Sequence, residues 1–264
     1  MDRGLAPLVM GIVNVTTDSF SDGGRFIDVP RAIEHGLRLH EDGADFVDVG
    51  GESTRPGAAR VEEGVELARV IPVVEALAAR GIDVSVDTMK PAVMREAIRA
   101  GAGVVNDVNA FRAEGAIGAV APTDARLVVM HMQGTPATMQ EDPRYADVVE
   151  EVISYLRSRI AALEAEGVSP TRIAIDPGFG FGKTVAHNKA LFHALPRFAS
   201  LGYPVVAGLS RKKMLGDFTG RPAGERAAAS VAAALLAVQN GAGIVRVHDV
   251  RQTVDALKTW MELR

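Results

Sequence analysis

The chain has 264 residues, of which 47% are hydrophobic, and a formal net charge of −4 at pH 7. A chain of this size and composition can bury a large core, and its weak negative charge argues against nucleic acid as the main partner. It contains no cysteine, which excludes disulfides, zinc–thiolate sites, iron–sulfur clusters and cysteine nucleophiles. No apolar stretch is long enough to cross a membrane, so we expect a cytoplasmic protein without a membrane partner.

Eight apolar runs with strand character recur along the chain. They cover residues 8–15, 45–49, 82–87, 103–108, 126–131, 172–176, 204–209 and 243–247. Helical patterns lie between them, as at 30–43, 61–81, 90–101, 145–167 and 225–243, and several of these end in glycine. Eight evenly spaced β-then-α units predict an α/β fold, a closed (β/α)8 TIM barrel, with an open doubly wound sheet as the alternative. Because the chain has no linker or composition break, we predict one domain over residues 1–264.

Polar, glycine-rich segments follow all eight predicted strands. In chain order they read NVTTDSFSDGG, DVGGESTRPGA, SVDT, VNDVNAF, MHMQGT, IDPGFGFG, GLSRKKMLG and RVHD. Barrel enzymes carry their chemistry at the carboxyl ends of the strands, whereas a purely structural rim would need only turn residues there. We therefore predict a site built from the whole rim, with the long loops after the first two strands acting as mobile lids.

The segment IDPGFGFGKT, at residues 175–184, ends like a phosphate-binding P-loop in Gly182, Lys183 and Thr184. A P-loop also requires a glycine five positions before Gly182, and that position holds Pro177, which has no N–H to donate. The sequence therefore does not predict a P-loop, and we expect Lys183 and Thr184 to begin a helix. The chemistry of the segment is then expected to lie in Asp176, which ends the apolar run.

The segments GIVNVTTDSFSDGG, GGESTRPGA, VNDV, MHMQGTP, IDPGFGFGK, GLSRKKMLG and RVHDV together resemble the dihydropteroate synthase family. The resemblance extends over nearly the whole chain. It implies a TIM barrel that joins 6-hydroxymethyl-7,8-dihydropterin diphosphate to p-aminobenzoate, releasing diphosphate, with Mg²⁺ as the cofactor. Related pterin-binding methyltransferases share the barrel and its acidic pocket but should lack the paired loops TTDSFSDGG and ESTRPG, which this chain has.

The expected pterin subsite rests on two arguments, the hydrogen-bonding groups of a pterin and the family resemblance. A pterin edge presents an amino group and a ring N–H side by side, and one carboxylate can accept both, so Asp176 is our first choice. The resemblance adds Asp87 and Asn106 to the polar floor and Lys212 as a donor to the carbonyl side of the ring. We expect a pterin, held at its edge, to lie in the mouth of the barrel.

The expected diphosphate subsite lies at the last strand. Arg246 and His248 are two residues apart, so they share one face of that strand and can act as an anion clamp. By the resemblance, Asn14 is the metal-linked asparagine, and Mg²⁺ should arrive with the diphosphate because it takes most of its ligands from phosphates and water. Together with Asp87 and Lys212, Arg246 and His248 form the predicted catalytic group.

The second substrate is expected under the two long loops. The resemblance implies that p-aminobenzoate is seated by Phe20, Thr54, Arg55, Pro56 and Ser210. An aryl amine is already neutral near pH 7, so no strong base is required, and breaking the pterin C–O bond is the difficult step. We therefore expect an SN1-like path in which the loops exclude water.

Other residues have two interpretations. Met130 and Phe181 are expected to wall the pterin, whereas His131 between two methionines is more typical of core packing. Asp107 suits either the site or an ion pair with a nearby cation. The alanine-rich segment 227–238 fits the face of a homodimer, which the resemblance implies, and it equally fits packing on the barrel.

Two other classes of function remain open on the sequence. A non-catalytic pterin- or folate-binding protein would need the pocket but not the loops. A phosphate-binding barrel enzyme such as an aldolase or isomerase would have no pterin affinity. Formation of product from the two substrates distinguishes the synthase from a binding protein, and pterin affinity distinguishes both from the third class.

Overall fold

The computed structural model describes residues 6–16 and 29–263. Its eight strands are β1 (Leu8–Asn14), β2 (Phe46–Gly50), β3 (Val84–Asp87), β4 (Val104–Asp107), β5 (Arg126–Met130), β6 (Ile173–Asp176), β7 (Val206–Ala207) and β8 (Ile244–Val247). The pairing is parallel throughout, in the order β6-β5-β4-β3-β2-β1-β8-β7. An isolated parallel bridge between Ile175 and Val205 brings the two ends of the sheet together. The barrel prediction is confirmed, and the open sheet is excluded.

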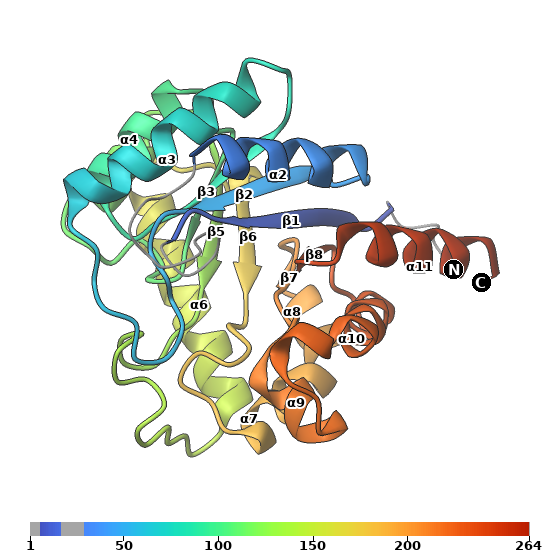
Figure 1. Ribbon diagram of the computed structural model, residues 1–264. Coiled ribbons are helices and arrows are strands. Elements are labelled where there is room, and N and C mark those ends of the chain that lie inside the picture. Colours follow the sequence, from blue (N-terminus) through green and yellow to red (C-terminus); the bar gives the residue numbers. More distant parts are fainter. Residues whose placement is uncertain (1–5, 17–28, 264) are drawn as a thin grey trace.

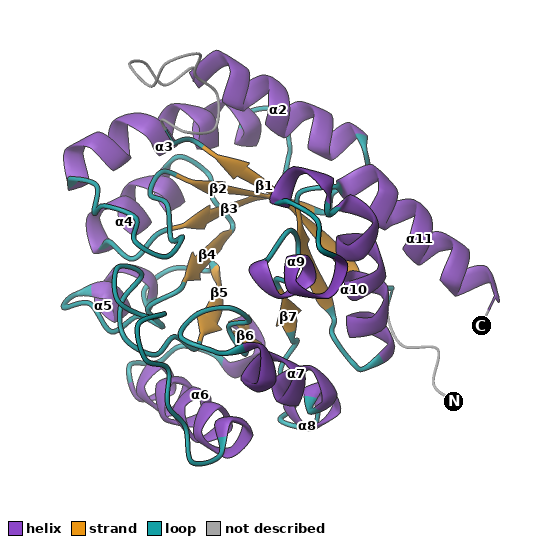
Figure 2. Cartoon of the chain, turned by 60° about the horizontal axis from the view of Figure 1, so that its bottom comes forward, coloured by secondary structure: helices purple, strands orange, loops and turns teal. Residues whose placement is uncertain are grey.

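The helices surround the strands (Figures 1 and 2). They are α2 (Val29–Glu41), α3 (Glu63–Ala78), α4 (Pro91–Arg99), α5 (Ala116–Val120), α6 (Val148–Ala165), α7 (Val185–His193), α8 (Leu195–Ala199), α9 (Lys213–Thr219), α10 (Ala227–Gln239) and α11 (Val250–Leu263). The five helical segments named from the sequence correspond to α2, α3, α4, α6 and α10. None of the helices in the described part of the chain is long and apolar enough to span a bilayer.

The seventh strand is much shorter than predicted. The run 204–209 yields only Val206–Ala207, while Val205 makes the bridge to Ile175. Pro204 has no N–H for the ladder, and Gly208 has no side chain to pack, so the two ends of the run support little pairing. The polar end of the run therefore begins the loop that carries Ser210 and Lys212.

Two apolar layers leave one end of the barrel free for polar groups. Inside the barrel, an interior cluster consists of Met10, Phe46, Val104, Val128, Ala174, Val206 and Ile244. A larger cluster fills the space between the strands and the helices. Because side chains alternate along a strand, the inward position after the interior cluster lies two residues nearer the carboxyl end. Polar residues at those positions form the mouth of the barrel.

Candidate active site

The mouth is lined by the residues that lie two positions beyond the interior cluster. Asp48 follows Phe46, Asn106 follows Val104, Asp176 follows Ala174 and Arg246 follows Ile244. Asp48, Asn106 and Asp176 are buried, and Arg246 is partly exposed. The period of two in each strand thus gathers four polar side chains from distant parts of the sequence. Asn106, Asp176 and Arg246 were expected here, and Asp48 was not.

Arg246 is held between two carboxylates. Its Nε donates to Asp48 Oδ2 at 2.6 Å, and its Nη2 donates to Asp87 Oδ2 at 2.8 Å. Asn106 Nδ2 also donates to Asp48 Oδ2, at 3.2 Å. Burial raises the pKa of Asp87, while the Arg246 guanidinium opposes the rise. These contacts fix the guanidinium plane and leave only part of it to meet an anion.

Asp48 is the residue that sequence reasoning missed. It lies fully buried within the apolar run of β2, where a charged side chain is costly unless it is paired. An acidic residue inside the run 45–49 was the available signal, but its partner Arg246 is 198 positions away in the chain. Only the barrel makes the two neighbours.

Asp176 presents its carboxylate from the end of β6. Its Oδ1 accepts the N–H of Gly178 at 2.6 Å, and Oδ2 faces Gly208, where even an added Cβ would be 3.9 Å away. Burial raises the pKa of Asp176, whereas Lys212, the Gly178 hydrogen bond, Lys183 and Arg246 oppose the rise. Asp176 Oδ2 thus faces Gly208, just after β7, where no side chain stands in front of the oxygen.

Lys212 approaches the same mouth from the loop after β7. Its Nζ donates to the carbonyl of Phe179 and lies 4.3 Å from the ring centroid of Phe181. Burial lowers its pKa to about 8, although Asp176 opposes the change. Phe181 also packs with Met130, Val108, Met132 and Met139, so the two expected wall residues belong to one apolar cluster. The structure brings Asp176, Lys212, Phe181 and Met130 together.

His131 and Lys183 form a buried pair behind this wall. Lys183 Nζ lies 2.9 Å from His131 Nδ1, and burial followed by Lys183 lowers the pKa of His131 to about 3. His131 is buried, as expected of core packing. Thr184 caps α7 by accepting the N–H of His187, so the helix begins directly after Lys183, in agreement with the prediction.

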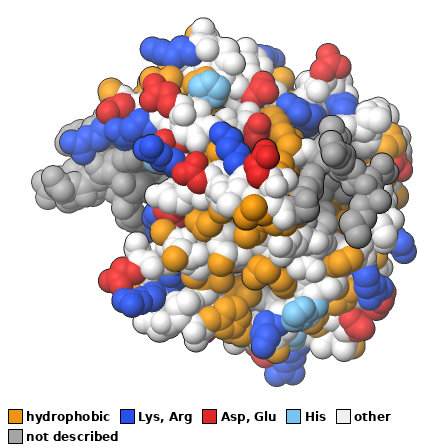
Figure 3. Space-filling model, turned by 90° about the vertical axis from the view of Figure 1, so that its right-hand side faces the viewer, with side chains coloured by type: hydrophobic (Ala, Val, Ile, Leu, Met, Phe, Trp, Pro, Cys, Tyr) orange, Lys and Arg blue, Asp and Glu red, His pale blue; other side chains and the backbone are white. Residues whose placement is uncertain are grey.

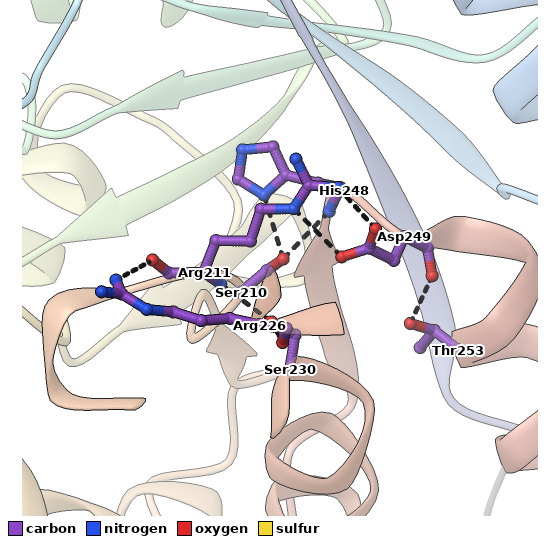
Figure 4. A network of polar contacts seen from close by, with 7 residues as sticks. All are labelled: Ser210, Arg211, Arg226, Ser230, His248, Asp249 and Thr253. Carbon is purple, nitrogen blue, oxygen red and sulfur yellow. Dashed lines mark hydrogen bonds and ion pairs between the residues drawn. The ribbon is translucent and has the colours of Figure 1, made fainter. Parts of the chain in front are cut away.

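His248 and Ser210 are joined at the mouth (Figure 4). Ser210 Oγ lies 2.9 Å from His248 Nδ1 and accepts the His248 backbone N–H at 3.2 Å. Burial, together with the charges of Arg246 and Arg211, lowers the pKa of His248 to about 3. The imidazole is therefore neutral at physiological pH and can serve as a hydrogen-bonding group, while Arg246, Arg211 and Arg55 supply the cationic charge around it.

Arg211 holds the loop between Ser210 and Lys212 in an unusual conformation. Its φ is 58°, and its guanidinium makes a bidentate ion pair with Asp249 at 2.6 and 3.2 Å. Ser230 Oγ accepts the Arg211 N–H, and Arg226 donates to the Arg211 carbonyl (Figure 4). A left-handed non-glycine residue is strained unless its surroundings fix it. Here the network fixes it, so the side chains on either side both reach the mouth.

The loop after β2 lines a hollow beside the mouth. The hollow has a volume of about 420 Å³, and its lining includes Thr16, Ser53, Arg55, Pro56 and Arg69. Among the expected p-aminobenzoate residues, Arg55 and Pro56 line the hollow, Thr54 is half-buried in the same loop, and Phe20 lies outside the described residues.

The loop after β2 is tied down at its start. Lys90, buried after β3, makes ion pairs with Glu52 of the loop and with Glu66 of α3. Thr88 Oγ1 donates to Glu66 Oε1 at 2.6 Å. Farther along, Gly57 donates its N–H to the Pro136 carbonyl at 3.2 Å. The loop is therefore anchored near its start and at its middle. The first long loop, residues 17–28, lies outside the described part.

A second hollow, of about 430 Å³, lies on the outside of the barrel at α5 and α6. It contains none of the predicted site residues. Asp107 lies next to this region: its oxygens accept the N–H groups of Asn109 and Phe111 at 2.7 and 2.6 Å, and the charges of Arg112 and Arg159 oppose the rise in its pKa that burial causes. Asp107 therefore stabilises a turn through the positive-φ residues Ala110 and Phe111.

Asn14 ends β1 and is half-buried, on the same face of the strand as Met10. Within residues 6–16 and 29–263, no group of three His, Cys, Asp or Glu residues could hold a metal ion. In this part of the chain, the ligand that the resemblance implies is the neutral amide oxygen of Asn14. Such a ligand fits Mg²⁺ only where phosphate oxygens and water supply the other ligands.

Comparison with known proteins agrees with this geometry. The model of the family described as pterin binding enzyme matches residues 10–248. The dihydropteroate synthase of Escherichia coli K12 is 47% identical over 253 residues, covering 96% of this chain and 90% of that protein, and the one from Neisseria meningitidis serogroup C is 49% identical over 262 residues, covering 97% and 93%.

Solved structures agree as well. The Xanthomonas albilineans dihydropteroate synthase with 4-aminobenzoic acid superimposes with a TM-score of 0.92 at 55% identity, covering 97% of this chain and 93% of that one. The same enzyme in complex with 7,8-dihydropteroate gives 0.89 at 52% identity, with the same coverage. Because the family model matches residues 10–248 and the relatives share about half of their residues and the fold over nearly the full length, the chain belongs to the pterin-binding enzyme family, among the dihydropteroate synthases.

Proposed function

We propose that the chain condenses 6-hydroxymethyl-7,8-dihydropterin diphosphate with p-aminobenzoate to give 7,8-dihydropteroate and diphosphate. The reaction is an alkyl transfer, and its product serves folate biosynthesis. One observation carries the proposal: a carboxylate, Asp176, keeps an oxygen directed into a mouth that Lys212, Asn106 and Arg246 share. The related X. albilineans structures hold 4-aminobenzoic acid and 7,8-dihydropteroate, which supports the same substrates here.

The pterin lies against the polar floor. Asp176 accepts from the amino group and ring N–H, and Lys212 donates to the carbonyl side. Asn106 is oriented by its hydrogen bond to Asp48, which leaves its carbonyl oxygen for the ring edge. Asp87 acts mainly by holding Arg246, and the cluster of Met130 and Phe181 supplies the apolar wall.

The diphosphate lies near β8 and β1. Arg246 supplies positive charge, and neutral His248 supplies a hydrogen bond, fixed by Ser210. Asn14 would hold Mg²⁺ together with phosphate oxygens, and the metal would neutralise charge on the departing diphosphate.

Asn14→Ala should lower turnover strongly while binding of 6-hydroxymethylpterin, which has no phosphate, stays nearly unchanged. Calorimetry alongside a turnover assay checks this, and an equal loss of both would mean that Asn14 serves the fold.

In the reaction, the bond between the pterin methylene carbon and the diphosphate oxygen breaks first. Its electron pair leaves with the diphosphate, and the electron-rich dihydropterin spreads the positive charge that remains. The amine nitrogen of p-aminobenzoate then donates its lone pair to the carbon and loses a proton. Arg246 and His248 stabilise the leaving group, and the loop with Thr54, Arg55 and Pro56, together with Phe20 and Ser210, seats the amine and excludes water.

A homodimer of single-domain subunits is the assembly that we propose. The pairing of β1 with β8 supports one domain, because it joins the two ends of the chain in one barrel. Along α10, Ala228, Ala232 and Leu236 form an exposed apolar row. Figure 3 faces the side on which α10 and α11 lie in Figure 1, and it shows apolar side chains gathered there. Light scattering on the purified protein checks the assembly. A cytoplasmic location stays a prediction from the sequence.

The decisive test is turnover with the two substrates and Mg²⁺, followed by chromatography of the product. We expect dihydropteroate to form, with release of diphosphate. Tight pterin binding without product would instead indicate a binding protein. No pterin affinity at all would indicate a barrel enzyme of a different class.

A further inference from the structure

Lys183 is a buried cation that the reaction does not use directly. Only 3% of its surface is exposed. Its Nζ lies 2.9 Å from the carbonyls of Gly178 and Phe181, 2.9 Å from His131 Nδ1 and 3.3 Å from the His131 carbonyl. Burying an ammonium group is costly unless its protons are all bonded. An apolar side chain could fill this space without the cost of burying a charge. The hydrogen bonds of Lys183 therefore need an explanation beyond packing.

We propose that Lys183 is a positioning residue of the pterin subsite: it ties the turn at residues 177–182 to the end of β5 and thereby sets the orientation of Asp176. The proposal deepens the proposed function and rests on it. Lys183 does not touch the substrate, and its effect passes through the turn.

Gly178 is the link between Lys183 and Asp176. Its carbonyl accepts from Lys183, and its N–H donates to Asp176 Oδ1 at 2.6 Å. Its φ is 72°, and a Cβ at this position would collide with the carbonyl oxygen of His131. The turn therefore lies as close to β5 as the backbone allows. With Oδ1 engaged by Gly178, Asp176 can offer Oδ2 to the pterin.

The same turn also positions Lys212. The Phe179 carbonyl accepts from Lys212 Nζ, and the Phe181 ring lies under that cation. Lys183 holds the carbonyl of Phe181 itself. A turn released from Lys183 would therefore displace Asp176, Phe181 and Lys212 together, which are the groups expected to contact the pterin.

Besides its role in the turn, Lys183 also affects the ionisation of Asp176 through its charge. Asp176 faces Lys212, Lys183 and Arg246, and each of the three cations favours its ionised form against burial. Lys183 faces Lys212, Asp176 and neutral His131. Burial and Lys212 lower the pKa of Lys183, whereas its four acceptors favour an ammonium group with three protons. Removal of Lys183 should therefore raise the pKa of Asp176.

The test is Lys183→Met, which keeps the length of the side chain and removes its protons. Lys189→Met, at an exposed position on α7, is the charge-matched control. Binding of 6-hydroxymethylpterin should weaken by roughly 10- to 100-fold in Lys183→Met, the usual range for losing a supporting polar contact, and not in the control. As the pH is lowered, the variant should lose pterin affinity at a higher pH than the native protein. The KM for the pterin diphosphate should rise more than kcat falls.

Two further measurements separate positioning from folding. Without ligand, the Gly178 amide should exchange faster in Lys183→Met than in Lys189→Met. In the background of Asp176→Asn, Lys183→Met should weaken pterin binding by a smaller factor than it does in the native protein, because the part of its influence that passes through Asp176 is already lost. Native pterin affinity in Lys183→Met, or full additivity with Asp176→Asn, would overturn the inference. Absence of pterin binding by the native chain would instead overturn the proposed function.

Discussion

Asp176 is buried, yet its Oδ2 faces Gly208, which has no side chain, and this combination makes Asp176 the most informative single residue. Asp176→Asn keeps the size of the side chain and removes the charged acceptor. Pterin affinity should fall by about 1.5 to 3 kcal/mol, the range for a hydrogen bond to a charged group. Calorimetry with 6-hydroxymethylpterin measures the change, with exposed Asp124→Asn as the control. Unchanged affinity would remove Asp176 from the site.

Lys212 predicts how pterin binding depends on pH. Burial lowers its pKa from 10.5 to about 8, so the cation is lost as the pH rises through about 8. Pterin affinity should decline over the same range, and Lys212→Met should bind more weakly while lacking this alkaline decline. Unfolding does not explain such a decline: between about 8 and 10.5 the unfolded state binds more protons at Lys212, so this residue makes folding more favourable as the pH rises. An identical pH profile in Lys212→Met would exclude the assignment.

The elements that carry the site are the loops after the strands, and polar cross-links between neighbouring loops set their positions. Lys183 joins the loop after β6 to the end of β5, and Lys90 joins the loop after β2 to α3 and the end of β3. Arg211 and Asp249 join the loops after β7 and β8. Each of these loops thus depends on a neighbour for its conformation.

The link at Lys90 can be tested by Lys90→Met, which leaves Glu52 and Glu66 without their cation. Breaking a buried ion pair in this way typically costs about 3 to 5 kcal/mol. We expect a loss of that order in the free energy of unfolding, measured with urea, and a higher KM for p-aminobenzoate as the loop is released. Adding Glu66→Gln should recover part of the stability, because one unpaired charge is removed. A stability equal to that of Lys258→Met, an exposed control on α11, would contradict the role of Lys90.

For the whole molecule, the order of binding follows from where the subsites lie. The residues proposed for the pterin and the diphosphate lie mostly at strand ends, whereas those proposed for p-aminobenzoate lie mostly in loops. We predict that p-aminobenzoate does not bind measurably alone, and that it binds once diphosphate and Mg²⁺ are present, with protection of residues 53–57 in hydrogen exchange. The matching prediction for residues 19–24 lies outside the described residues. Tight binding of the amine without any anion, while 53–57 still exchange freely, would rule out loop closure as the origin of this subsite.

The amino-acid sequence by itself determined the barrel and most of its mouth. Alternation of apolar strands with helical segments predicted eight β-then-α units, and a period of two predicted which side chains point inward. Polar residues directly after those strands therefore had to meet at one end. For this reason the sequence placed Asp176, Arg246 and His248 at the mouth, and the resemblance to dihydropteroate synthases added Asn106.

Only the tertiary structure decided how those side chains are paired. Asp48 meets Arg246 because β2 and β8 both adjoin β1, which the sequence pattern of neither strand reveals. Lys183 looked like the end of a failed P-loop and is instead buried under its own turn, while Asp107 stabilises a turn. Local patterns specify periodicity and burial, whereas the partner of a buried charge depends on contacts between residues far apart in the chain, and these exist only once the barrel has closed.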